Sequence, residues 1–146
     1  MERPGNPEFT VESLKAWFAS LGRTFPTDLG IEPLEINDEY SRGRIVVDER
    51  HLHPGKLVHG GVWVGLGDTV AAWQTFRHLP PGCDFTTVEL KLNAFAPGRL
   101  GDELTATARH LHEGRSTHAL SVEIERGDGR RAAHLIVTQF VLAPAD

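Results

Sequence analysis

The stretch from Gly60 to Phe76 constrains the fold of this chain more than any other part of the sequence. It contains no proline and predicts a helix of 17 residues, which Pro80-Pro81-Gly82 would end. Apolar side chains occur on every side of this helix, and Asp68 is its one charged residue. Because a helix without a polar stripe is buried on nearly every side, the rest of the chain is expected to wrap around it.

The remaining sequence predicts mostly strands. A short amphipathic helix is expected first, over 10–21, with Thr10 as its cap. Strands are expected where apolar and polar residues alternate or apolar residues cluster, over 28–37, 40–48, 88–94, 104–109, 118–124 and 131–142. Turns at 113–114 and 127–129 would join the last three strands into an antiparallel meander. The expected fold class is α+β: an antiparallel sheet wrapped around one long central helix, in a single domain (1–146) with an N-terminal helical extension (1–25).

Composition argues against several classes of function. The formal net charge is −5, and no stretch concentrates enough lysine and arginine to neutralise several phosphates, so no nucleic-acid partner is expected. There is one cysteine, Cys83, which excludes an intramolecular disulfide and favours a reducing compartment. The first residues lack an apolar signal core, and no run approaches the ~20 apolar residues of a membrane span. No membrane partner is expected, and a cytoplasmic location follows by elimination.

Asp68 is the first candidate for chemistry. An ionised carboxylate in apolar surroundings is costly unless it is paired or hydrogen-bonded. It would be structural if an arginine or backbone amides paired with it. Alternatively, partial desolvation keeps the carboxylate reactive and raises its pKa, as at many catalytic sites. We adopt the second interpretation as the working hypothesis.

The start of the same helix is the second candidate. His59-Gly60-Gly61 places unobstructed backbone N–H groups at the positive end of the helix, which suits a developing oxyanion. Asp68 lies eight residues after Gly60, about 12 Å along the helix, too far for both to act on one carbonyl. The two groups converge only if two such helices lie antiparallel in a homodimer. The sheet face turned away from the helix also looks partly apolar, so dimers are expected to pair into a homotetramer.

Two motifs in this order resemble one enzyme family. The run HGGVWVGLGDT from His59 to Thr69 is similar to the signature of the hotdog-fold acyl-CoA thioesterases of the phenylacetate-degradation (PaaI-like) type. The run TVELKLNAFAP from Thr87 to Pro97 is similar to the second recurring segment of that family, and the resemblance covers roughly 45–142. It implies the hotdog fold and the hydrolysis of acyl-CoA thioesters, with coenzyme A as part of the substrate and no other cofactor.

The resemblance also implies roles for individual residues. The Gly60 N–H, flanked by His59 and Gly61, would polarise the thioester carbonyl, while Asp68 of the partner chain attacks it or activates a water. Family members usually carry Asn where this chain has His53 and Gly where it has Lys56. The residues expected to contact substrate are His53, Trp63, Thr69, Asn93, Arg99 and Arg115. Basic side chains bind phosphate well, so these arginines, with Arg77 and Lys91, are the candidates for holding coenzyme A.

Three other functions compete with this one. His51, His53 and His59 have irregular spacing and no acidic or cysteine partner nearby in sequence, so no metal site is expected. His51-Leu52-His53-Pro54 faintly resembles the histidine loop of hotdog dehydratases and hydratases, which act on 3-hydroxyacyl thioesters. A non-catalytic acyl-CoA-binding domain of the same fold would have no use for a buried Asp68.

Overall fold

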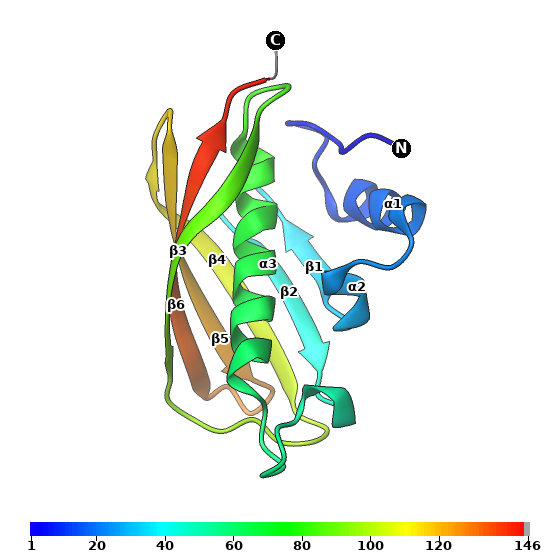
Figure 1. Cartoon of the computed structure of the whole chain (residues 1–146), viewed down its shortest axis with the longest axis vertical. Helices are drawn as coiled ribbons and strands as arrows, with labels where there is room; N and C mark the ends of the chain where they lie inside the picture. The colour runs from blue at the N-terminus through cyan, green and yellow to red at the C-terminus, as the bar shows by residue number, and fades with distance from the viewer. Residues whose placement is uncertain (145–146) are drawn as a thin grey trace.

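The computed structural model describes residues 1–144 and is built around one long helix, α3 (Gly60–His78). A single antiparallel sheet packs against this helix, and its strand order is β1-β2-β4-β5-β6-β3. Figure 1 shows α3 lying along the sheet with its axis close to the strand direction. The strands are β1 (Glu32–Ile36), β2 (Ser41–Val46), β3 (Asp84–Ala94), β4 (Glu103–Glu113), β5 (Thr117–Arg126) and β6 (Arg131–Leu142).

Two further helices precede the sheet and lie on the β1 side of α3 (Figure 1). Helix α1 (Val11–Leu21) begins at Thr10, whose hydroxyl accepts a hydrogen bond from the Ser13 N–H. Helix α2 (Phe25–Asp28) is a single turn. Aromatic side chains join this N-terminal segment to α3: the ring centroids of Phe9 and Phe76 are 5.5 Å apart.

Close approach between α3 and the sheet explains the glycines near the middle of the contact. A Cβ on Gly67 would lie 2.6 Å from Leu135 Cδ2 of β6. On the facing strand β2, a Cβ on Gly43 would lie 2.5 Å from the ring of Trp73. Because protein interiors are close-packed, these positions accept no side chain without displacing a buried neighbour. The helix therefore sits deep against the sheet, with Leu66, Val70 and Trp73 in the core.

The α+β architecture predicted from the sequence is confirmed. The N-terminal helix, the central helix and all six strands are present, and β4, β5 and β6 form the predicted meander. The pattern of apolar and polar residues in the sequence did not predict α2 or the short 3₁₀ helix Glu49–His51. The strand expected over 28–37 begins only at Glu32, because α2 ends at Asp28 and a turn at 29–30 follows it. None of the helices in the described part of the chain is long and apolar enough to cross a membrane.

Candidate active site

Asp68 lies on the one face of α3 that the rest of the chain leaves partly uncovered. Between Val62 and Thr75 every residue is buried except Val64, Asp68 and Ala72. These three residues are spaced by four, so they form one stripe along the helix. The exposed Gly60 begins the stripe, which places the helix start and the carboxylate on the same side of α3.

The Asp68 carboxylate has one hydrogen-bond partner within residues 1–144, the Thr87 hydroxyl, which donates to Oδ1 at 2.9 Å. No arginine, lysine or histidine in that range forms an ion pair with it. Burial raises the pKa of the Asp68 carboxyl above its usual range, and the hydrogen bond from Thr87 opposes that rise. The arginine-paired structural aspartate considered from the sequence is therefore absent from the described structure.

An irregularity in β3 aims Thr87 at this carboxylate. The pairing of β3 with β6 shifts between Thr87 and Glu89, so that Val88 is an extra residue in the ladder. Regular alternation from the partly buried Leu90 and Leu92 would turn Val88 inward and Thr87 outward. The bulge reverses this arrangement, and Val88 is 58% exposed. Bulges commonly re-aim a side chain next to a functional site.

An apolar cavity of about 340 Å³ opens beside Asp68. Its walls come from α3 and from the N-terminal segment, and they consist mainly of aromatic side chains. Thr69, a predicted substrate contact, also lines it. The aromatic wall residues are Trp17, Phe18, Phe25, Trp73 and Phe76. A cavity of this size, mostly apolar with one carboxylate at its edge, has the composition of a small-molecule site.

At the helix start, His59 is the N-cap and its Nδ1 accepts a hydrogen bond of 2.8 Å from the Gly61 N–H. The imidazole of His59 therefore acts as the N-cap of α3. The expectation that both glycine amides are unobstructed is wrong for Gly61, because the imidazole caps its amide. The first N–H groups of a helix have no partner within the helix, so Gly60 is the candidate that remains for a free amide at the helix start. Among residues 1–144, no atom outside the adjoining helix backbone lies within 4 Å of where a Gly60 Cβ would be.

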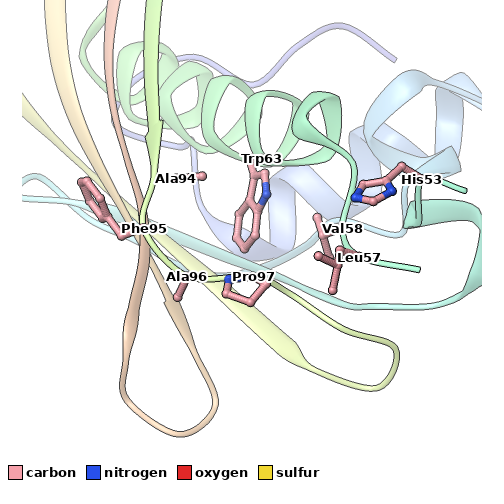
Figure 2. Close-up of a pocket in the computed structure, with 8 residues that line it drawn as sticks. All are labelled: His53, Leu57, Val58, Trp63, Ala94, Phe95, Ala96 and Pro97. Carbon is pink, nitrogen blue, oxygen red and sulfur yellow. The ribbon is translucent and has the colours of Figure 1, made fainter. Parts of the chain in front are cut away.

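A second cavity, of about 320 Å³, lies near the helix start and is lined by two of the predicted substrate contacts, His53 and Trp63. Figure 2 shows the Trp63 indole projecting away from α3 into the space bounded by Val58, Ala96 and Pro97. His53 is held in place because its Nδ1 accepts a hydrogen bond from the Gly55 N–H at 2.9 Å. The end of the second motif, 94–97, forms the opposite wall.

The remaining predicted contacts do not come together within one chain. Asn93 is exposed on β3 and lines neither cavity. Arg99 is exposed close to the helix start, where its neighbour Gly98 packs against Val58 and Trp63. Arg115 is exposed in the β4–β5 turn, two residues after Glu113, which contacts the far end of α3.

Of the two other basic candidates, one is already paired and one is exposed. Arg77 forms an ion pair with Asp38 at 2.7 Å. Lys91 is exposed on β3. Sequence reasoning missed Thr87 as the partner of Asp68, and it missed the aromatic wall that Trp17 and Phe18 contribute to the cavity. The sequence predicts only an amphipathic helix over 10–21, and such a periodicity does not show which surface the apolar side of the helix covers.

His51 is unsuited to acid–base catalysis. Its side chain is fully buried, Nδ1 accepts from the Asp48 N–H at 2.9 Å, and Nε2 bonds the Leu29 carbonyl at 2.8 Å. Both ring nitrogens are therefore engaged in holding the loop before α3. Of the two histidines in the loop that resembles that of the dehydratases, His51 thus has a structural role, whereas His53 lines the cavity near the helix start.

An antiparallel sheet wrapped around a central helix that carries one acid is the hotdog arrangement. The chain belongs to the thioesterase superfamily, whose family model matches residues 55–133. A putative esterase of Pseudomonas aeruginosa is 29% identical over 115 residues, covering 78% of this chain and 79% of that protein. The acyl-coenzyme A thioesterase PaaI of Escherichia coli is 28% identical over 96 residues, covering 66% of each.

Solved structures agree with this assignment. A thioesterase from Haemophilus influenzae superposes with a TM-score of 0.88 at 23% identity, covering 97% of this chain and 96% of that one, which establishes the fold. A mutant thioesterase from Pseudomonas aeruginosa superposes with a TM-score of 0.84 at 26% identity, and the match covers 94% of this chain and 95% of that one. A hypothetical thioesterase from Streptococcus pneumoniae, solved with coenzyme A, superposes with a TM-score of 0.72 at 25% identity. The match covers 80% of this chain and 88% of that one.

Proposed function

We propose that the protein hydrolyses acyl-CoA thioesters to the free acid and coenzyme A, with Asp68 as the reacting carboxylate. The observation that carries this proposal is the environment of Asp68. It is the one charge of the helix between Gly60 and Phe76, it has a raised pKa, and it borders an apolar cavity. A carboxylate kept partly desolvated beside a cavity is typical of a catalytic base or nucleophile. Membership of the thioesterase superfamily and similarity to an acyl-CoA thioesterase agree with this chemistry.

In the proposed reaction the Gly60 N–H donates a hydrogen bond to the thioester carbonyl oxygen and stabilises the negative charge that develops there. As a general base, the Asp68 carboxylate takes a proton from a water whose oxygen attacks the carbonyl carbon. The tetrahedral intermediate then expels the coenzyme A thiolate, which receives that proton. As a nucleophile, the carboxylate would instead attack the carbonyl carbon and expel the coenzyme A thiolate, which leaves an acyl anhydride on Asp68. Water then hydrolyses the anhydride to the free acid and the carboxylate, and the proton released goes to the thiolate. Both routes require the ionised form of Asp68.

The acyl group would occupy the aromatic cavity beside Asp68. This cavity offers apolar walls, and each methylene buried there contributes about 0.8 kcal/mol, or roughly fourfold in affinity. We therefore expect aromatic or medium-length apolar acyl groups to react faster than acetyl-CoA. His53 and Trp63, at the helix start, would contact the part of the substrate near the thioester. The exposed Arg99 and Arg115 would bind the phosphates of coenzyme A.

Each site would be shared between two chains. Gly60 and Asp68 are about 12 Å apart along α3, whereas hydrolysis requires both within ~3 Å of the reacting group. The uncovered stripe of α3 contains both residues, and β3 beside it is an edge strand of the sheet. A second copy packed antiparallel against this side would bring its own Gly60 to Asp68. Exposed apolar residues on the outer sheet face, including Phe140 and Leu142, support a further pairing of dimers into a tetramer.

The activity is tested by incubating the purified protein with a panel of acyl-CoA substrates and a thiol-trapping dye. Release of free coenzyme A is expected, with apolar acyl groups preferred. A dehydratase would change the acyl chain and leave the thioester intact, and a binding domain would change neither. Mass spectrometry of the acyl product separates these outcomes, and the absence of thiol release across the panel would refute the proposal.

The shared site is tested by complementation. Asp68→Asn chains are mixed with Gly60→Val chains under conditions that allow subunit exchange. A mixed dimer has one site with both substitutions and one with neither, so up to half of its sites should recover while each parent stays inactive. Native mass spectrometry measures the exchange. If mixed dimers form and no activity returns, Asp68 acts within its own chain.

A further inference from the structure

A cluster of histidines lies at the end of α3 opposite to the helix start. His78 from α3, His110 from β4 and His118 from β5 meet there. The ring centroids of His78 and His110 are 4.7 Å apart, and those of His110 and His118 are 4.9 Å apart. Glu113 completes the group, because its Oε2 lies 3.1 Å from His78 Nδ1. The inner face of the sheet is otherwise largely apolar, so this polar group calls for a physical reason.

A second bulge brings two of these residues to the same side of β4. The pairing of β4 with β5 shifts between His110 and His112, so that Leu111 is an extra residue in the ladder. In a regular strand, residues three apart point to opposite faces. The bulge instead turns both His110 and Glu113 toward α3, and Leu111 is 61% exposed. The bulge thus interrupts the regular pairing of β4 with β5 at the place where His110 and Glu113 come to lie on the same side of the strand.

We propose that His78, His110 and Glu113 bind a divalent transition-metal ion, with Zn²⁺ as the occupant. Each residue offers one ligand atom, and these atoms lie within 4.8 Å of one another. Two imidazoles and one carboxylate form a common zinc ligand set that leaves a fourth position for water. Glu113 is partly exposed on its strand, so its side chain is free to rotate and close the ligand distances to the ~2 Å of a zinc bond.

Neighbouring groups orient these ligands in the way that metal sites require. The Nε2 of His78 lies 3.0 Å from the Asp38 carbonyl oxygen, which leaves Nδ1 directed toward Glu113. The Nε2 of His110 lies 2.9 Å from His118 Nδ1, and the side chain of His118 is 3% exposed. Histidine ligands usually bond a carbonyl or another acceptor through their second nitrogen, which fixes the ring.

This site is separate from the proposed thioesterase site. His78 lies ten residues after Asp68, about 15 Å further along α3. An ion held there would join the end of α3 to the β4–β5 hairpin. Its role would be to stabilise the fold, because an ion that binds only the folded chain shifts the unfolding equilibrium toward it. The proposal does not depend on the hydrolytic activity, since binding is measured directly.

The test uses tag-free protein that has been stripped with a chelator, freed of chelator by gel filtration and titrated with ZnCl₂. Calorimetry is expected to show one Zn²⁺ per chain, and the melting temperature should rise on addition of zinc. Co²⁺ in place of zinc should give the visible absorption of a four-coordinate site. Glu113→Gln and His110→Gln should each weaken zinc binding by at least ~10²-fold, since even residues that only orient ligands account for 10–100-fold.

His112→Gln is the matched control. His112 is an exposed histidine on the same strand, outside the proposed ligand set, so this variant should bind zinc as the wild type does. Circular dichroism confirms that each variant is folded. Lack of stoichiometric zinc binding by the wild type would overturn the proposal and leave only a polar contact between His78 and Glu113. Wild-type affinity in folded Glu113→Gln and His110→Gln would overturn it equally.

Discussion

Replacing Asp68 with asparagine separates the catalytic role of its charge from its role in packing. Asparagine has nearly the same shape, and its side-chain oxygen can still accept the 2.9 Å hydrogen bond from Thr87. The variant loses the carboxylate that both proposed routes require. We expect kcat to fall by at least ~10², the effect typical of removing a general base, which corresponds to about 2.7 kcal/mol of transition-state stabilisation.

The same substitution should not destabilise the fold. Burial raises the pKa of Asp68, so the folded chain holds this proton more tightly than the unfolded chain does. The stability gained from that proton is present at low pH and is lost as pH rises through the raised pKa. At neutral pH the ionised carboxylate therefore costs stability, and asparagine removes that cost. We expect an equal or higher melting temperature, with a rise of up to about 3 °C for a gain on the order of 1 kcal/mol in a chain of this size.

The assay measures coenzyme A release and thermal unfolding on the same preparation. Glu125→Gln, which removes an exposed carboxylate on β5, controls for the change in net charge and should behave as the wild type does. Wild-type turnover by a folded Asp68→Asn protein would refute the catalytic role. A large loss of stability would instead show that Asp68 is a structural residue whose ionised carboxylate stabilises the folded chain.

Three further outcomes are expected. Gly60→Val should lower turnover by about 10²-fold or more and change the melting temperature little, because a Cβ at this position meets no atom of residues 1–144 within 4 Å while the added side chain crowds the amide; outright unfolding in a melting experiment would contradict the oxyanion role. Thr87→Val removes the hydroxyl that lowers the pKa of Asp68, so the acidic limb of the kcat/KM profile should move to higher pH, and an unmoved limb would contradict this. Gly67→Ala should cost about 1–2 kcal/mol in urea unfolding, because crowding against Leu135 outweighs the gain in helix propensity, whereas unchanged or raised stability would show that the sheet yields there.

The central helix and its acid could be predicted because both follow from local sequence. Apolar residues on every side of a helix require burial on every side, and a lone charge in such a helix requires a reason. The dimensions of a helix then place Gly60 and Asp68 about 12 Å apart without any knowledge of the sheet. These inferences needed only the order of residues along one element.

Strand order and the walls of the cavity could not be obtained in this way. β3 precedes β4 in the chain, yet it pairs with β6 at the far edge of the sheet. That pairing depends on which apolar faces pack together after the whole chain has folded. Similarly, the amphipathic pattern of α1 predicts that Trp17 faces inward but not that it lines a cavity beside Asp68. A contact between two distant segments does not produce a periodic pattern of apolar residues in the sequence of either segment.

The bulges show most clearly why the partners of the reactive groups stay hidden in the sequence. A strand alternates with period two, so one inserted residue exchanges the inward and outward sets beyond it. In β3 the insertion of Val88 turns Thr87 toward Asp68, and in β4 the insertion of Leu111 turns Glu113 toward His78. Both inserted residues are apolar and exposed, the reverse of what alternation predicts for Val88. In β3, the exposed apolar residue Val88 therefore marks the position at which regular pairing is interrupted and Thr87 turns toward Asp68.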